Sequence, residues 1–222
     1  MNGWDAKLTY PGTPVGGYTA GAQGGTAVIR PTTCRDPRTG KVYHINSGGA
    51  RVWTPPTSIP SGVGTGGSWA SFSPSTASPN GASAVDTIRG RLLVVNGGST
   101  AAVRFDLDGG SMTATGVTLT GTPAATIGAA PETDGWGMDF VPELDAFLLK
   151  RGTTNGAEIF KINASTYAVT LYAPTGGSSV PLASAIAASN ANVFGRWHYV
   201  PRLRGIVYPV RNAANAWFLR TH

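Results

Sequence analysis

One segment of the chain occurs twice with a similar sequence. Residues 140–150 read "FVPELDAFLLK" and residues 199–209 read "YVPRLRGIVYP". Extended further, residues 140–162 align with residues 199–221 without a gap, and apolar positions fall on apolar positions. Looser copies begin earlier, as "CRDPRTGKVYHINSGGARVWT" at 34–54 and "DTIRGRLLVVNGGSTAAVRFDL" at 86–107. An internal repeat of this length restricts the chain to architectures built from equivalent units.

Each copy follows the same order of local signals. A short strand leads to a turn rich in Pro, Gly or Asp, then to a continuous apolar strand, a Gly/Asn loop and an alternating strand. Segments such as "ATGVTL" at 114–119 and "YAVTLY" at 167–172 add a fourth, outer strand. Four strands per unit, at a period of about 50 to 60 residues, are typical of a propeller blade. No stretch shows a convincing helical period, which disfavours an α/β alternative. The sequence therefore predicts an all-β fold, a single β-propeller domain spanning residues 1–222.

The repeats predict four four-stranded blades, over residues 22–57, 68–120, 134–173 and 194–222. The last copy stops after its third strand. The alternating segment "AKLTY" at residues 6–10 has no unit of its own, so we expect it to supply the missing outer strand and remove an open edge. The alternatives are half of an eight-bladed ring completed by a second chain, or a fragment of a longer protein.

The turn segments carry a resemblance to a known family. The segments "RDPRTGKVY" at 35–43, "FVPELDAFLL" at 140–149, "GRWHYVPRLRGIVY" at 195–208 and "NAWFLR" at 215–220 resemble kelch-like, galactose-oxidase-like β-propellers of the bacterial or phage-encoded type. The Gly-Gly pair that ends the second strand in kelch repeats is kept at 48–49 and 97–98 and lost in the last two blades. The resemblance implies the propeller architecture and raises a copper-radical site as one activity.

The residues do not favour that activity or another enzyme. The resemblance asks for two His, two Tyr and a Cys, and the chain offers His44, His198, His222 and one cysteine. We expect His44 in a buried second strand and His198 in a first strand, neither exposed on a long loop, so we interpret both as structural. A glycosidase pair would need Asp134 and Asp139 to converge. We therefore predict no catalytic residue, no metal and no cofactor.

Charge and cysteine content restrict the partners. The formal charge is +6, from 17 basic and 11 acidic residues, without a basic run, which favours a solvated basic surface over nucleic-acid binding. The single Cys34 allows neither an intrachain disulfide nor a paired-cysteine zinc site. No signal peptide and no apolar stretch of membrane-spanning length is visible, so we expect a location in the cytoplasm or in a virion and no membrane partner.

Binding residues are predicted on one rim. The long connections 55–79, 121–134 and 175–194 should lie there with the Gly/Asn loops, opposite a rim of tight turns only. Trp residues beside Asn and Arg suit a sugar or a protein edge, although the rings could instead fill spaces between blades. We expect the filling role for Trp197 and a more exposed role for Trp136, which lies between two glycines. The candidate residues are Trp136, Arg151, Asn155, Arg196, Arg211, Asn212 and Asn215.

These observations favour a non-enzymatic interaction or structural module of a larger assembly, with other protein subunits as partners. Few Lys and Glu, many Ala, Gly, Ser and Thr, and the resemblance to phage-encoded propellers favour a phage virion, in its tail or an accessory position. A glycan-binding module is the alternative, a copper oxidase comes third and a nucleic-acid binder last. The oligomeric state stays open.

Overall fold

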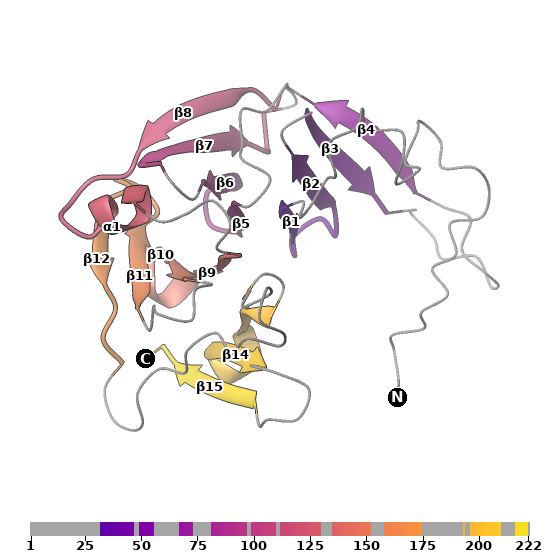
Figure 1. Ribbon diagram of the computed structural model, residues 1–222. Coiled ribbons are helices and arrows are strands. Elements are labelled where there is room, and N and C mark those ends of the chain that lie inside the picture. The colour runs from indigo at the N-terminus through magenta and orange to yellow at the C-terminus, as the bar shows by residue number, and fades with distance from the viewer. Residues whose placement is uncertain are drawn as a thin grey trace.

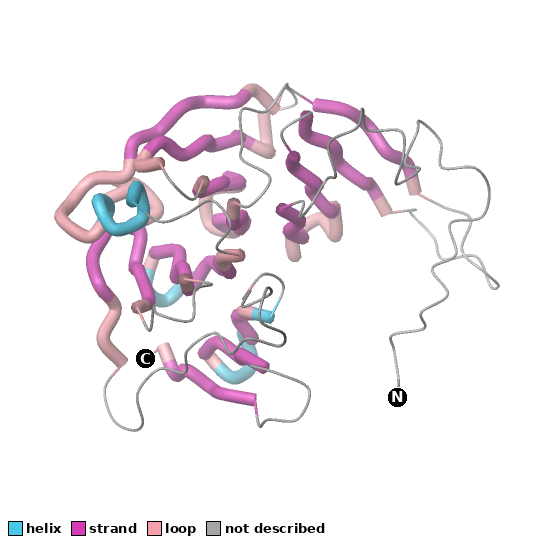
Figure 2. The backbone as a smooth tube through the Cα atoms, viewed as in Figure 1, coloured by secondary structure: helices cyan, strands magenta, loops and turns pink. Residues whose placement is uncertain are grey.

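The computed structural model describes residues 32–46, 49–55, 67–72, 81–96, 99–109, 112–129, 135–151, 158–174, 193, 196–209 and 216–221. In this part of the chain, four antiparallel sheets fan around a common centre, with β1, β5 and β9 innermost in the first three (Figure 1). The protein is a four-bladed β-propeller, as the repeats predict. Strands dominate the described backbone (Figure 2).

Each blade is a meander whose strands follow chain order from the centre outward. The first blade consists of β1 (Thr32–Arg35), β2 (Val42–Asn46), β3 (Gly49–Thr54) and β4 (Ser68–Phe72). The second consists of β5 (Ala82–Asp86), β6 (Arg91–Val95), β7 (Ala101–Asp106) and β8 (Ala114–Thr118). The third consists of β9 (Gly137–Val141), β10 (Ala146–Lys150), β11 (Ile159–Asn163) and β12 (Val169–Leu171). The last consists of β13 (His198–Val200), β14 (Gly205–Pro209) and β15 (Ala216–Arg220).

One predicted blade boundary is wrong. Residues 68–72 were expected to begin the second blade, but β4 pairs with β3, with Val52 opposite Ala70 and Ala50 opposite Phe72. Phe72 also packs edge-on against Tyr43 and Phe105, which places it at the boundary between the first two blades. Strand β3 therefore ends, and β4 begins, on the rim that was predicted to carry tight turns only.

A left-handed residue ends the turn between the first and second strands of every blade. Gly40 and Gly90 take φ values of 74° and 62°, and Asp145 and Arg204 take 45° and 48°. The left-handed conformation favours glycine because other residues place a Cβ against the backbone. In the last two blades the turn begins with proline, in the short 3-10 helices Pro142–Leu144 and Pro201–Leu203. The duplicated segment is therefore the inner hairpin of a blade.

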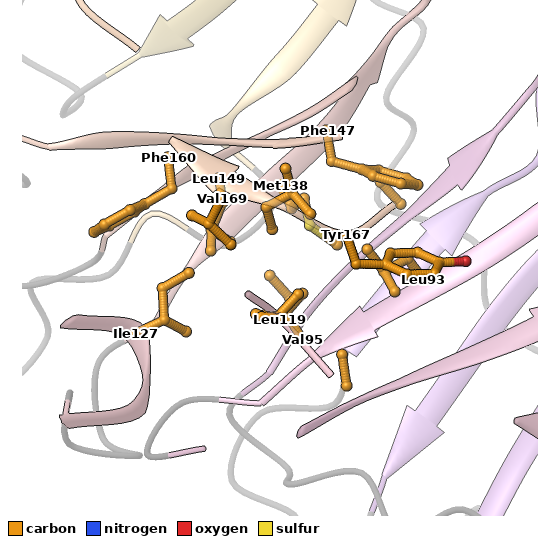
Figure 3. Packing of buried hydrophobic residues seen from close by; sticks show 14 of the residues in the cluster. Leu93, Val95, Leu119, Ile127, Met138, Phe147, Leu149, Phe160, Tyr167 and Val169 are labelled. Carbon is orange, nitrogen blue, oxygen red and sulfur yellow. The ribbon is translucent and has the colours of Figure 1, made fainter. Parts of the chain in front are cut away.

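The hydrophobic core lies between neighbouring blades. As predicted, the second strands are its most apolar part, because β6 and β10 are buried almost throughout. The cluster between the second and third blades is shown in Figure 3, where Leu93 and Val95 face Met138 and Leu149. Two further clusters join the first blade to the second and the third to the last.

A helix was not predicted. Helix α1 (Ala124–Ala129) lies in the connection between β8 and β9, and it buries Ala124 and Ile127 in the cluster of Figure 3. Six residues are too few for a helical period to appear in the sequence. The proposed closing strand at residues 6–10 lies outside the described residues.

Candidate functional site: the two rims

The strand directions define two rims. The turn rim carries the connections from first to second strands, residues 36–41, 87–90, 142–145 and 201–204. The loop rim, on the opposite side, carries the ends of the second strands and the starts of the first. Trp136, Arg151 and Arg196 lie on the loop rim, as predicted, whereas Asn155, Arg211, Asn212 and Asn215 lie outside the described residues.

Two of the predicted binding residues come together on the loop rim. Gly137 pairs with Lys150, so the residues next to them, Trp136 and Arg151, are neighbours. The guanidinium carbon of Arg151 lies 6.0 Å from the centroid of the Trp136 ring. This is the distance at which a cation interacts with an aromatic face. Arg196 is half-buried in the last blade, directly before Trp197.

The exposed role predicted for Trp136 is wrong. Its side chain is only 3% exposed, and the ring packs 6.0 Å from Phe160 between the second and third blades. The flanking Gly135 and Gly137 are themselves buried, so they do not hold the ring out in solvent, and burial of a large indole is favourable. Its buried Nε1 has no hydrogen-bond partner among the residues that the structure describes. Trp136 therefore offers no platform for a sugar.

The filling role predicted for Trp197 is confirmed. Its side chain is 3% exposed, and it packs 5.7 Å from the Tyr208 ring between the third and last blades. Its Nε1 donates a hydrogen bond of 3.0 Å to the carbonyl oxygen of Leu148 in β10. The indole thus joins two blades both by contact and by a bond to the backbone.

A buried lysine also lies at the end of β10 on the loop rim. The side chain of Lys150 is fully buried, and its Nζ donates to the Arg151 carbonyl oxygen at 3.3 Å. Burial lowers the pKa of this amine to about 8, although the nearby Glu158 carboxylate opposes the shift. Burial of Lys150 could not be predicted from the sequence, because a charged residue at the end of an apolar strand usually points to solvent.

Cys34, His44 and His198, which were considered for a copper site, lie in strands β1, β2 and β13. His44 is buried in β2 and lies 3.3 Å from the Thr33 hydroxyl, and His198 is exposed in β13. Burial raises the pKa of the Cys34 thiol to about 12, which keeps it protonated at neutral pH. Within the described ranges, no three His, Cys, Asp or Glu side chains gather as metal ligands. His222 and Asp134 lie outside these ranges.

Asp139 has a structural partner in the next blade. Its carboxylate accepts hydrogen bonds from the backbone N–H groups of Tyr199, at 2.8 Å, and Phe140, at 2.9 Å. Tyr199 belongs to β13, so this bond links the inner strands of the third and last blades. Burial raises the pKa of Asp139 to about 6, against the effect of these two donors.

The turn rim carries a series of polar contacts that cross blade boundaries. Arg89 forms an ion pair of 3.0 Å with Asp86, which precedes the same turn. Its guanidinium also donates to both carboxylate oxygens of Asp145, in the third blade, at 2.6 Å. Arg38 likewise forms ion pairs with Asp36 of its own turn, at 2.9 Å, and with Asp108 of the second blade, at 3.0 Å.

The third and last blades are joined on the same rim. Glu143 accepts a hydrogen bond from the Tyr199 hydroxyl, and Arg204 lies 3.5 Å from the same carboxylate. Each boundary between consecutive blades thus has a charged contact on this rim. An Asp followed two or three residues later by an Arg marks the first two turns in the sequence, but only the folded structure shows the partner in the next blade.

Apolar side chains stand out among these charges. Ile88 is 58% exposed beside Arg89, and Leu203 is 53% exposed between Arg202 and Arg204. Both occupy the turn between the first and second strands, Ile88 in the second blade and Leu203 in the last. The turn rim therefore presents large aliphatic groups next to arginines.

Comparisons of the sequence with known proteins add no relationship. No protein-family model matches the chain, and no curated protein matches it significantly. The described helices include none with the length and hydropathy of a membrane span. The fold and the two rims are thus the observations from which a function can be inferred.

Proposed function

We propose that this protein is a non-enzymatic β-propeller that acts as an interaction or structural module of a larger assembly and contacts other protein subunits through its turn rim. The observation that supports this proposal most directly is the projection of Ile88 and Leu203 from turns in which Arg89 and Arg204 lie against carboxylates of the same rim. The buried centre of a protein interface is more apolar than its rim, and arginine is enriched there relative to the rest of the protein surface.

The ion pairs strengthen the argument because they order the rim before a partner arrives. Association costs about 0.5–1.5 kcal/mol for each flexible side chain that must be immobilised. Arg38 and Arg89 are each held by two carboxylates, so they lose less freedom on binding. The chain uses 13 arginines and four lysines, and arginine is the cation that interfaces favour.

For the assembly itself, we propose a phage virion, with the protein in the tail or an accessory position. The support comes from the composition, poor in Lys and Glu and rich in Ala, Gly, Ser and Thr, and from the resemblance of the turn segments to kelch-like propellers of phages and bacteria. Glycan binding is the weaker candidate, because the described structure buries both Trp136 and Trp197, on which that hypothesis depended.

Site-directed photocrosslinking tests the proposal. A benzophenone amino acid is placed at Ile88 or Leu203 of the full chain, which is produced in the native host during particle assembly. Leu171, which is 58% exposed on the outer strand β12, is the matched control. We expect irradiation to join positions 88 and 203 to particle proteins and to leave position 171 unjoined.

Two results would contradict the proposal. Adducts at position 171 equal to those at 88 and 203 would show that the turn rim has no special role. Particles that assemble with the chain absent from them would remove the virion assignment. A glycan array serves as the test of the weaker candidate, and saturable binding to one sugar would replace the interaction module with a lectin.

A further inference from the structure

The turn of the last blade is a charge-reversed copy of the turn of the third blade. Residues 142–145 read "PELD" and residues 201–204 read "PRLR". Both turns are short 3-10 helices that start with proline and end on a left-handed residue. The φ and ψ angles are 45° and 46° at Asp145 and 48° and 54° at Arg204. The two turns therefore direct equivalent side chains in the same way within their blades, but with opposite charge.

In the third blade, this turn contacts the next blade. Leu144 packs, partly buried, against the cluster between the third and last blades. Glu143 accepts a hydrogen bond from the Tyr199 hydroxyl and lies 3.5 Å from Arg204. The third blade thus shows how a turn of this shape binds a neighbouring surface. Its leucine makes an apolar contact, and the charged residue before the leucine pairs with a group of opposite charge.

The equivalent residues of the last blade are exposed. Leu203, which corresponds to Leu144, is 53% exposed, and Arg202, which corresponds to Glu143, is also exposed. The last blade therefore presents to solvent the same pair of positions with which the third blade binds its neighbour.

Two residues of β15 enlarge this surface. Phe218 is 44% exposed, and its ring lies against Gly205, where a Cβ would be 2.6 Å from two of the ring atoms. Arg220 is exposed and pairs with Gly205. Thr221 donates to the Arg204 carbonyl oxygen from its hydroxyl, at 2.9 Å, and from its N–H, at 3.2 Å, which fixes β15 to the turn. The basic turn surface consists of Arg202, Leu203, Arg204, Phe218 and Arg220.

The carboxylates of the turn rim do not neutralise this surface. Each carboxylate described on this rim already forms an ion pair with an arginine, namely Asp36, Asp86, Asp106, Asp108, Glu143 and Asp145. Among them, Glu143 is the one that contacts the basic turn surface, through Arg204. Arg202 and Arg220 have no ion pair within the described part of the chain. Two exposed arginines therefore remain for carboxylates from outside the propeller.

The first blade, which follows the last one around the ring, does not offer such a carboxylate. Asp36 is the only acidic residue between positions 32 and 72. It is fully buried and accepts hydrogen bonds from Arg38 and Thr39. The exposed residue before it, Arg35, has the same charge as the basic turn surface. A partner of opposite charge must therefore come from another molecule.

We propose that the basic turn surface binds an acidic segment of another protein subunit. Asp or Glu side chains of this segment pair with Arg202 and Arg220, and an apolar side chain lies against Leu203 and Phe218. Arginine suits this role because its planar guanidinium binds carboxylates through two hydrogen bonds. Phosphates of a nucleic acid would satisfy the arginines but leave the leucine and the phenylalanine without apolar contact. The proposal rests on the proposed function, because it names the chemistry of the partner that contacts the turn rim.

Photocrosslinking from β15 tests the proposal. Benzoylphenylalanine replaces Phe218, whose ring it resembles, in the full chain during particle assembly in the native host. The matched control carries it at Trp217, which is 40% exposed on the same strand but pairs with Tyr208 toward the loop rim. We expect position 218 to join a subunit peptide that contains Asp or Glu beside an apolar residue, and position 217 to leave that peptide unjoined.

Charge reversal then tests the arginines. Arg202→Glu should lower the yield of the adduct from position 218 by about tenfold or more, because it places like charges together. Lys161→Glu, in the middle of β11, is the matched control and should keep the yield. Circular dichroism confirms that both variants fold. Exchange of the joined Asp or Glu of the partner for Lys should restore the adduct of the Arg202→Glu variant.

Several outcomes would overturn the proposal. Adducts to particle proteins from position 88 but not from 218 would keep the proposed function and remove the acidic partner. A joined peptide without Asp or Glu, or a yield unchanged by Arg202→Glu, would do the same. Adducts that a nuclease digests would make the partner a nucleic acid. Adducts within the chain or between two of its copies, distinguished by isotope labelling, would make the surface a self-contact. Adducts from neither 88 nor 218 would remove the proposed function as well.

Discussion

The two rims of this propeller hold neighbouring blades together with different forces. On the turn rim, Arg38, Arg89 and Glu143 contact charged or polar groups of the next blade and remain partly open to water. On the loop rim, Trp136, Trp197 and helix α1 fill the spaces between blades with apolar surface. Burial of large apolar groups stabilises by several kcal/mol, whereas exposed ion pairs contribute at most about 1 kcal/mol. The polar contacts of the turn rim therefore stabilise the blade boundaries less than the buried apolar groups of the loop rim do.

The largest effect is expected from Trp197→Ala. Loss of this buried ring should lower the free energy of unfolding by about 3–5 kcal/mol, because it leaves a cavity between the third and last blades. Denaturant unfolding measures the change, and Leu171→Ala, at a position 58% exposed, should shift it by no more than about 0.5 kcal/mol. Equal losses in the two variants would show that the loop rim is not fastened by burial.

The pH dependence of stability separates Asp139 from the turn rim. Its pKa is about 6 in the folded state and 3.8 as the ordinary value. The folded state thus binds the proton of Asp139 more tightly than the unfolded state does. The contribution of Asp139 to the free energy of unfolding is therefore greatest below pH 4. It falls by about 2–3 kcal/mol as the pH rises through 6. The turn-rim carboxylates Asp145 and Glu143, whose pKa values arginine or tyrosine partners lower, act oppositely and lose stability below about pH 4.

Denaturant titrations between pH 3 and pH 7 check this prediction. Asp139→Asn should remove the gain in stability between pH 6 and pH 4 and keep the loss at lower pH. Asp145→Asn should do the reverse, by reducing only the loss at low pH. If Asp139→Asn kept the full gain, another group would be responsible for it.

Trp→Phe substitutions at the two buried tryptophans compare one hydrogen bond directly. At position 197 the change removes the donor to the Leu148 carbonyl. At position 136 it removes an Nε1 for which the described residues offer no partner. Both variants lose similar ring volume, so the variant at 197 should be less stable than the variant at 136 by about 1 kcal/mol. Chemical denaturation of both variants in one buffer measures the difference. A larger loss at 136 would mean that its Nε1 is satisfied in solution.

The smallest effect is expected from the bidentate pair between Arg89 and Asp145. A double-mutant cycle with Arg89→Met and Asp145→Asn should give a coupling of about 0.5–1 kcal/mol at low salt. The coupling should shrink in about 1 M NaCl, where the screening length is about 3 Å. The effect of Trp197→Ala should not shrink. A salt-independent coupling would show that the pair acts through packing.

The sequence predicted the blades because the features that define them are local. A tight turn, an apolar second strand and an alternating third strand leave a pattern in neighbouring residues, which is why residues 86–107 and 140–162 are recognisable as copies. The two blades differ in the length of the loop between the second and third strands. Leu92 pairs with Phe105 but Phe147 pairs with Ile162, so the third blade has two more residues here.

Features that depend on a neighbouring blade could not be predicted in this way. Two glycines around Trp136 indicate a flexible surface loop, but the space between blades that receives the ring exists only after folding. The short "SWASF" of β4 has little pattern of its own and is identified by its hydrogen bonds to β3. Likewise, Asp145 looks like an ordinary turn residue until Arg89, 56 positions earlier, is brought against it.

The left-handed residue at the end of each inner hairpin has a consequence for how the repeat is preserved. Four different contexts end in Gly40, Gly90, Asp145 or Arg204, with the same sign of φ. The four blades thus share a backbone dihedral angle at this position and not a side chain. We therefore expect that the turn of one blade can replace the turn of another without loss of the fold. The condition is that the charged side chains of the transferred turn meet opposite charges in the neighbouring blade.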